Sequence, residues 1–151
     1  MQLKSLEDTA IFSEKIAGLI DLGDTIFLYG EIGVGKTTFV RFLINYLEKK
    51  NNIKSSEVLS PTFNIVYDYD IKNIKILHYD LYRLQNFNDI SQLGIFETFN
   101  NSIKIIEWPE LIKTKPNNRI DILFKYSELK DARKVQSIGF GRWKDYKFDE
   151  I

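Results

Sequence analysis

The chain contains no cysteine among its 151 residues. This absence excludes disulfide bonds, zinc–thiolate sites and cysteine nucleophiles, and it fits a reducing compartment. An excess of one charge sign is also absent, because 21 Lys and Arg balance 21 Asp and Glu. A protein that binds nucleic acid by itself usually carries a basic excess. The balance therefore argues against a free-standing nucleic-acid binder, while contact with RNA through a larger assembly stays open.

Long hydrophobic runs are missing as well. No apolar segment approaches the roughly 20 residues that cross a bilayer, and residues 1–6 lack the basic and apolar stretches of a signal peptide. We therefore expect a cytoplasmic protein with no membrane association. The length suits a single domain over residues 1–151, and a hydrophobic content of 44% supplies its core.

Apolar periodicity predicts the helices. Ser5 and Asp8 have the spacing of a capping box in front of an amphipathic helix over 6–20. A second helix is expected from about Lys36 to Lys49. A third is expected over 89–100, interrupted or ended near Gly94.

Short runs of apolar or alternating residues predict the strands. We place them at 25–29, 64–70, 74–80, 103–107, 119–126 and 133–140. Lys72-Asn73 suits the turn of a hairpin between the second and third of these strands. The order of strand, loop and helix at the start, followed by mixed strands, predicts an α/β domain with a mixed sheet.

Residues 30–37 read Gly-Glu-Ile-Gly-Val-Gly-Lys-Thr and match the phosphate-binding P-loop pattern. Glycines let successive backbone N–H groups turn toward an anion, and the helix that follows adds its own free N–H groups. Lys36 can reach the β- and γ-phosphates, and the Thr37 hydroxyl can bind magnesium. A chance glycine turn is the alternative. However, the motif lies between a predicted buried strand and a predicted helix, which is the context that it requires.

The P-loop sharpens the fold class to a P-loop NTPase-like three-layer sandwich with a mixed, largely parallel sheet. It also predicts ATP and Mg²⁺ as ligands. The residues expected around the phosphates are Gly33, Val34, Gly35, Lys36, Thr37 and Thr38.

Two carboxylates end predicted strands, Asp80 after 74–79 and Glu107 after 103–106. Ligands of open α/β sheets gather at the carboxyl ends of strands, so both positions suit a metal site. A P-loop protein needs such an acid to complete the magnesium shell and to handle the attacking water or hydroxyl. A turn or helix-capping carboxylate is the alternative for each. The only histidine, His78, alternates with apolar neighbours on its strand and is interpreted as structural.

Three further signals stay open on spacing alone. Ser60-Pro61-Thr62-Phe63 suits an ordinary proline turn or a nucleotide-sensing switch, with the turn favoured. Arg83, just beyond Asp80, suits a surface arginine better than a phosphate ligand. Trp108, beside Glu107, suits a packed aromatic side chain or a gate at the site, and packing is the default.

Together these motifs resemble the TsaE (YjeE) family of small bacterial ATPases, which are required for threonylcarbamoyladenosine modification of tRNA. The similarity runs from about Thr9 to Glu110. Its matching segments are Leu-Tyr-Gly-Glu-Ile-Gly-Val-Gly-Lys-Thr-Thr-Phe at 28–39, Ser-Pro-Thr-Phe at 60–63, His-Tyr-Asp-Leu-Tyr-Arg-Leu at 78–84 and Ile-Glu-Trp-Pro-Glu at 106–110. One departure is Ile32-Gly33-Val34, where the family usually has Leu-Gly-Ala. The change is apolar and keeps the glycine.

The resemblance implies roles for individual residues. Lys36, Asp80, Glu107 and Thr62 become the expected catalytic residues, with Thr62 as a switch. Thr37 and Glu107 become the favoured magnesium ligands, with Asp80 as a third acid near the metal. Trp108 gains a functional role. Further nucleotide contacts are implied at Glu7, Thr9 and Arg133.

The resemblance also implies partners. Such proteins join a catalytic threonylcarbamoyl-transferase subunit (TsaD-like) and its inactive paralogue (TsaB-like), and they meet tRNA indirectly through that complex. The small ATPase hydrolyses ATP so that the complex can turn over, and it does not carry out the transfer.

Two other functions share the P-loop. A small-molecule kinase usually carries an arginine-rich mobile lid, whereas Arg83 stands alone between Asp80 and Glu107. A GTP-binding switch normally carries an Asn-Lys-x-Asp motif, which this sequence lacks. The kinase is the alternative to the ATPase interpretation.

Overall fold

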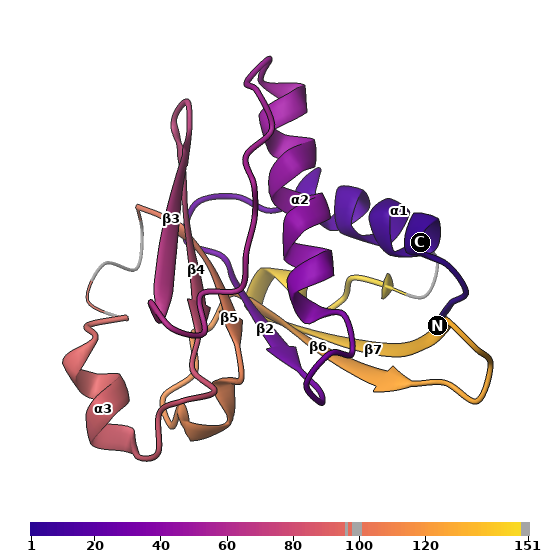
Figure 1. Cartoon of the computed structure of the whole chain (residues 1–151). Coiled ribbons are helices and arrows are strands. Elements are labelled where there is room, and N and C mark those ends of the chain that lie inside the picture. The colour runs from indigo at the N-terminus through magenta and orange to yellow at the C-terminus, as the bar shows by residue number, and fades with distance from the viewer. Residues whose placement is uncertain (96, 98–100, 149–151) are drawn as a thin grey trace.

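The computed structural model of the chain describes residues 1–148 except 96 and 98–100. Its strands are β1 (Gln2–Leu3), β2 (Thr25–Tyr29), β3 (Val66–Ile71), β4 (Ile74–Asp80), β5 (Ile103–Glu107), β6 (Arg119–Tyr126) and β7 (Arg133–Phe140). Its helices are α1 (Leu6–Ala17), α2 (Lys36–Lys50) and α3 (Phe87–Gln92), with 3₁₀ turns η1 (Pro109–Leu111) and η2 (Gly141–Trp143). In this part of the chain the strands form one sheet in the order β1-β7-β6-β2-β5-β4-β3 (Figure 1).

The centre of the sheet is parallel and its two edges are antiparallel. β2 pairs in parallel with both β5 and β6, and β5 pairs in parallel with β4. The β3–β4 hairpin forms one antiparallel edge, and β7 with β1 forms the other. The carboxyl ends of β2, β4 and β5 therefore meet at one edge of the sheet, which is where α/β proteins bind ligands.

Apolar side chains cover both faces of this sheet. Figure 1 shows α1 and α2 together on one side, and their core residues pack against β2 and β5. The rings of Phe12 and Phe39 lie 5.5 Å apart, and the Phe39 and Phe124 rings lie 5.8 Å apart. On the opposite face Phe27 and Ile106 belong to a second cluster, which α3 joins through Ile90. The three-layer α/β arrangement and its mixed sheet are confirmed, with the α3 layer the smaller one.

Most predicted elements are confirmed, five strands to the residue: 25–29, 74–80, 103–107, 119–126 and 133–140. The capping box is present, because the Ser5 hydroxyl accepts from the Asp8 N–H at 3.1 Å. The helix after it ends at Ala17 rather than at 20, and Gly18 caps it. The α2 boundaries match the prediction to within one residue.

β3, α3 and β1 differ further from the prediction. β3 begins at Val66 rather than at 64, because Ile65 takes a left-handed conformation and its N–H bonds back to Pro61. α3 begins at Phe87, since Asn86 caps it, and ends before Gly94; residues 96 and 98–100 of the predicted span lie outside the described residues. The two-residue strand β1 was not predicted. Among the described residues, none of the helices combines the length and apolar character needed to cross a membrane.

Candidate nucleotide-binding site

The P-loop connects β2 to α2 at the carboxyl edge of the sheet, as the sequence predicts. Gly30 has a φ of 130°, and a Cβ atom there would lie 2.4 Å from the Phe124 carbonyl oxygen, so no larger residue fits. Gly35 caps α2 with a φ of 117°, a conformation that only glycine adopts without strain. These glycines leave the first N–H groups of α2 free at its positive end, which is a ready-made anion site.

Lys36 lies at this helix start and is 4% exposed. Its Nζ donates to the carbonyl oxygens of Gly30 at 2.7 Å and Glu31 at 2.9 Å. It also lies 4.1 Å from the centre of the Trp108 ring, a cation–π contact. Burial lowers the pKa of the Lys36 ammonium, and nearby carboxylates, with Glu107 the strongest, oppose that shift. The structure thus places a cation at the mouth of the anion site.

Trp108 is brought to Lys36 by an unusual backbone conformation. Its φ of 59° and ψ of 56° lie in the left-handed region, which costs a bulky residue about 1–3 kcal/mol. The turn directly follows β5, so it swings the ring back over the P-loop. The Tyr82 ring packs against it at 4.8 Å. Strain of this kind concentrates at functional sites, which agrees with a role for Trp108 beyond packing.

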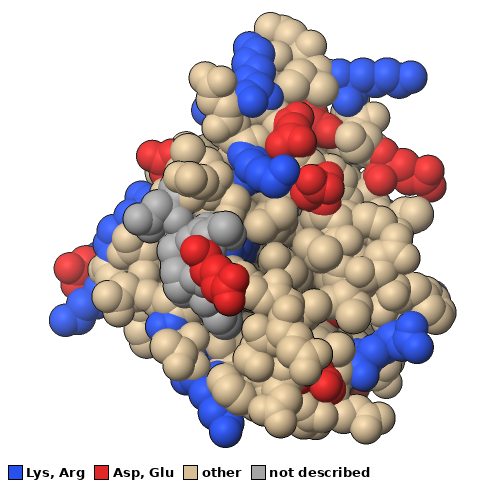
Figure 2. Space-filling model, turned by 90° about the vertical axis from the view of Figure 1, so that its left-hand side faces the viewer, with Lys and Arg blue, Asp and Glu red and all other residues tan. Residues whose placement is uncertain are grey.

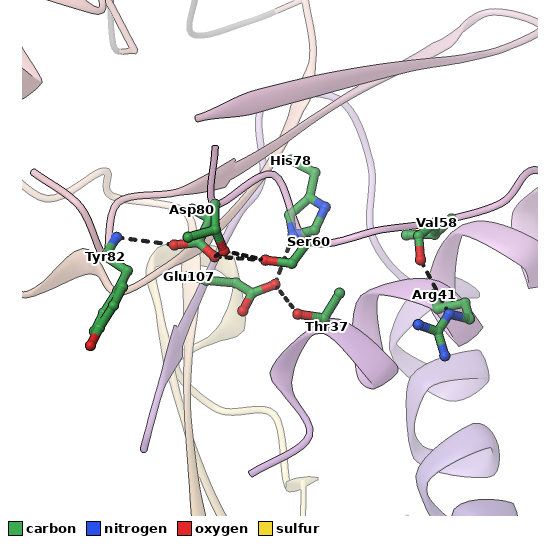
Figure 3. A network of polar contacts seen from close by, with 9 residues as sticks. Thr37, Arg41, Val58, Ser60, His78, Asp80, Tyr82 and Glu107 are labelled. Atoms are coloured by element: carbon green, nitrogen blue, oxygen red, sulfur yellow. Dashed lines mark hydrogen bonds and ion pairs between the residues drawn. The ribbon is translucent and has the colours of Figure 1, made fainter. Parts of the chain in front are cut away.

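Asp80 is 2% exposed and is held from both sides. Its Oδ2 accepts from the hydroxyls of Ser60 at 2.8 Å and Thr62 at 2.7 Å. Its Oδ1 accepts from the Tyr82 N–H at 3.0 Å. Figure 3 shows the contacts of Asp80 with Ser60 and Tyr82 beside Glu107. The Ser60–Phe63 turn is therefore tied to the strand-end acid, which the sequence did not show.

Glu107 is also 2% exposed and is the register partner of Asp80 on the adjacent parallel strand. Its Oε1 accepts from the Thr37 hydroxyl at 2.9 Å and lies 2.9 Å from His78 Nε2 (Figure 3). The first helical turn after the P-loop is thus linked directly to the end of β5. Register partners point to the same face of a sheet, so the two carboxylates face α2 together.

The connection from α2 to this site is anchored along its course. Arg41 on α2 donates to the Val58 carbonyl at 3.2 Å, two residues before Ser60 (Figure 3). Further back, the Glu48 carboxylate accepts from the Ser56 N–H and hydroxyl. These tethers lead the chain from the far end of α2 back to the P-loop, and they place Thr62 at the cavity.

A cavity of about 320 Å³ unites these groups. It is lined by Ile32, Gly33, Gly35, Lys36, Thr37, Thr38, Ser60, Thr62, Asp80, Tyr82, Glu107 and Trp108. All four expected catalytic residues and all three expected metal ligands are among them. Val34, by contrast, is fully buried beneath the loop, and Glu31 faces solvent.

The oxygen donors of this cavity fit magnesium bound together with phosphate. Mg²⁺ usually takes one or two carboxylates and completes its shell with waters and phosphate oxygens. Thr37, Glu107 and Asp80 supply hard oxygen atoms at one place. Among the described residues, no group of three or more His, Cys, Asp and Glu side chains is arranged to hold a metal alone. The hydroxyl and carboxylate oxygens that are present suit a magnesium ion that completes its shell with phosphate oxygens and water.

The three outlying candidates lie on the other side of the P-loop. Thr9 and Arg133 line a second cavity of about 100 Å³, which shares Gly33, Gly35 and Thr38 with the first. Arg133 Nε donates to the Val34 carbonyl at 2.8 Å, so it also braces the loop. Glu7 is exposed on the first turn of α1, next to the lining residue Leu6. Contact of these three residues with nucleotide stays a prediction.

Sequence reasoning missed two side chains that contact the strand-end carboxylates, Ser60 and His78. The sequence pattern assigns Ser60 only to a turn motif and favours a structural role for His78. Both contact strand-end carboxylates in the structure. The signal that could have found His78 is its place two residues before Asp80 on the same strand face. The Ser60 contact depends on a long connection whose path the sequence does not reveal.

Comparisons with known proteins agree with this geometry. The family model for threonylcarbamoyl adenosine biosynthesis protein TsaE matches residues 3–135. The tRNA threonylcarbamoyladenosine biosynthesis protein TsaE of Aquifex aeolicus is 38% identical over 135 residues, which cover 89% of this chain and 91% of that protein. The protein of the same name from Rickettsia conorii is 39% identical over 111 residues. That match covers 74% of this chain and 61% of the Rickettsia protein, less than two thirds of its length.

A solved structure supports the fold as well. The crystal structure of the Bacillus protein YdiB superposes with a TM-score of 0.72 at 23% identity, over 99% of this chain and 90% of that one. At that identity the likeness speaks for the fold alone. The family model, by contrast, spans most of the sequence, and the Aquifex relative aligns along most of both proteins. The chain therefore belongs to the TsaE family.

Proposed function

We propose that this chain binds ATP with magnesium in the P-loop cavity, hydrolyses it, and so supports turnover of the complex that forms threonylcarbamoyladenosine in tRNA. One observation carries the proposal. A phosphate-binding loop and two buried strand-end carboxylates line a single cavity, and Thr37 connects them through its hydrogen bond to Glu107.

Each residue of the cavity has a role in this proposal that follows from its chemistry. The free N–H groups at the start of α2 and the Lys36 ammonium bind the β- and γ-phosphates. Thr37 and Glu107 hold the metal, and Asp80 orients the attacking water from the neighbouring strand. Thr62, within the Ser60–Phe63 loop, ties that loop to the phosphate region through its hydrogen bond to Asp80. Magnesium, when bound, neutralises phosphate charge and polarises the phosphoryl group.

The partners proposed for this activity are a TsaD-like transferase subunit and its TsaB-like paralogue. Large apolar side chains are exposed at this cavity: Ile32 (69%) and Tyr82 (51%) line it, and Phe63 (82%) directly follows the lining residue Thr62. A protein surface that covered them would also exclude water from the cavity, which strengthens electrostatic stabilisation. We therefore expect weak hydrolysis by the isolated chain and faster hydrolysis in the complex.

The surface charge supports an indirect role toward tRNA. Figure 2 shows Lys and Arg interspersed with Asp and Glu on the face that it displays. The chain as a whole carries a formal net charge of zero. Binding to the phosphate backbone of RNA depends mainly on concentrated positive charge. We therefore assign the tRNA contact to the partners.

Replacing Lys36 tests the ATP site. Lys36→Ala removes the charged donor at the phosphates, and we expect hydrolysis to fall by about 100- to 1,000-fold. Lys49→Ala is the matched control, because it removes an exposed lysine from the far end of the same helix. Nucleotide binding and hydrolysis should be measured for both variants. Activity of Lys36→Ala equal to that of the control would contradict the site assignment.

The role in tRNA modification needs a separate measurement. Threonylcarbamoyladenosine formed per transferase pair should exceed one only with the intact chain and ATP. With Lys36→Ala, formation should stop near a single round. Repeated rounds with that variant, or without the chain, would contradict the proposed role even if the ATP site is right.

A further inference from the structure

The imidazole of His78 lies at the candidate metal site, although the sequence pattern indicated a structural residue. His78 is fully buried on β4, and Glu107 ends the adjacent parallel strand β5. Its Nε2 lies 2.9 Å from Glu107 Oε1. Because an ionised carboxylate can only accept a hydrogen bond, Nε2 carries the hydrogen and donates.

Packing alone does not account for a histidine at this position. The other ring nitrogen, Nδ1, is buried and has no hydrogen-bond partner in the part of the chain that the structure describes. A buried polar atom without a partner costs about 1–3 kcal/mol, a cost that an apolar side chain of similar size would avoid. The hydrogen bond to Glu107 is the interaction that an imidazole makes here and an apolar side chain could not make.

That contact restricts the Glu107 carboxylate. Thr37 and His78 approach the same oxygen, Oε1, one from α2 and the other from β4. Within the described residues Oε2 has no hydrogen bond, and Glu107 lines the P-loop cavity. A glutamate side chain has several rotamers. Two donors on one oxygen select among them and leave Oε2 for a metal ion or its water.

We propose that His78 is a positioning residue, whose Nε2–H holds the Glu107 carboxylate in the orientation that binds magnesium with the nucleotide. The inference rests on the proposed function, since it presumes that Glu107 serves the metal. Partners that orient a metal ligand typically change metal affinity or activity by about 10- to 100-fold when they are removed.

Two substitutions separate the hydrogen bond from packing. His78→Gln can still donate to Glu107 from its terminal amide, whereas His78→Met fills similar space without a donor. Binding of a fluorescent ADP analogue should be titrated with Mg²⁺, and also measured without it. We expect His78→Met to raise the half-saturating Mg²⁺ concentration by about 10- to 100-fold and to lower kcat. For His78→Gln we expect the half-saturating Mg²⁺ concentration and kcat to stay within about threefold of the parent values. Binding of the ADP analogue without Mg²⁺ should be unchanged in both variants.

The results distinguish this inference from the function on which it rests. If Met and Gln variants need the same Mg²⁺ as the parent, or lose Mg²⁺ sensitivity equally, the positioning role is wrong. A parent chain that binds no nucleotide contradicts the proposed function itself. A double-mutant cycle adds a check, because His78→Met should have little further effect on Mg²⁺ dependence once Glu107→Gln is present.

A spectroscopic measurement needs no substitution of His78. It is the chain's only histidine, so ¹⁵N-histidine labelling gives the signals of one ring. We expect Nε2 to carry the proton, and its resonance to shift in Glu107→Gln and on adding Mg²⁺ with ADP. Two results would overturn the inference, even if His78→Met does not fold. One is a ring that carries its hydrogen on Nδ1 and none on Nε2. The other is an Nε2 resonance that shifts neither in Glu107→Gln nor on adding Mg²⁺ with ADP.

Discussion

Buried carboxylates lie at both ends of the parallel strands, and they are compensated in different ways. Asp24, just before β2, is 2% exposed and accepts from Arg142 Nε at 2.7 Å and from Trp143 Nε1 at 3.0 Å. Glu107, at the end of β5, is equally buried, but within the described part of the chain its carboxylate bonds only to the Thr37 hydroxyl and the His78 imidazole. One carboxylate has a guanidinium partner, and the other does not.

The difference supports a structural role for Asp24 and the proposed metal-binding role for Glu107. The hydrogen bond to Asp24 raises the pKa of Arg142, and this ion pair attaches the segment around η2 to the start of β2. Among the described residues, no Lys or Arg forms an ion pair with Asp80 or Glu107. Two adjacent buried carboxylates that the Lys36 ammonium influences only at longer range are costly, so a metal that arrives with its nucleotide would relieve them.

The largest effect is expected from removing the charge of Glu107. Glu107→Gln keeps the shape and can still accept from Thr37 and His78, but it loses the charge that holds magnesium. We expect Mg²⁺-dependent hydrolysis to fall by about 100-fold or more, while nucleotide binding without Mg²⁺ and the melting temperature change little.

Glu110→Gln is the control for this loss of charge. Glu110 is exposed and lies close enough to influence Lys36 electrostatically. Its variant should hydrolyse ATP within about twofold of the parent, because an exposed charge is screened by solvent. If Glu107→Gln and Glu110→Gln hydrolyse ATP at similar rates, the lack of a guanidinium partner at Glu107 does not indicate a metal site.

Asp24 should show the opposite pattern. Asp24→Asn breaks the ion pair with Arg142, and we expect it to lower the free energy of unfolding by about 1–3 kcal/mol, since Arg142 is partly exposed. Hydrolysis at a temperature well below the transition should stay within about twofold. Asp68→Asn, which breaks a solvent-exposed pair with Lys75, should lower the free energy of unfolding much less. A large loss of activity in Asp24→Asn without a loss of stability would contradict its structural role.

The sequence predicted the sheet well, because its strands carry their own local signals. The runs at 25–29 and 103–107 are apolar and β-rich, as central strands buried on both faces must be. β1 could not be predicted, since two residues give no periodicity. β3 begins two residues later than predicted because Ile65 has a left-handed backbone conformation. Isoleucine seldom adopts that conformation, so nothing in the local sequence suggests it.

The candidate site was predictable in its motifs but not in its connections. The P-loop, Asp80 and Glu107 follow from spacing and strand ends. Which donor reaches which oxygen depends on register between strands and on the path of the connection after α2. His78 meets Glu107 because β4 and β5 align Asp80 with Glu107. That alignment is a property of the folded sheet: the place of His78 two residues before Asp80 indicates the face on which it lies, but not that it meets Glu107.

The smallest effect is expected in the Ser60–Phe63 loop, where two hydroxyls share one oxygen of Asp80 at nearly equal distances of 2.8 and 2.7 Å. If the loop acts only by holding Asp80, Ser60→Ala and Thr62→Ala should lower hydrolysis equally. If Thr62 also senses the phosphate, its variant should lose more. We expect about a tenfold fall for Thr62→Ala and about threefold for Ser60→Ala, in line with about 0.5–1.5 kcal/mol per hydrogen bond. Melting temperatures should fall alike, because each variant leaves Asp80 one hydroxyl donor and the Tyr82 N–H. Equal rates for the two variants would reduce Thr62 to a positioning role and leave the switch without support.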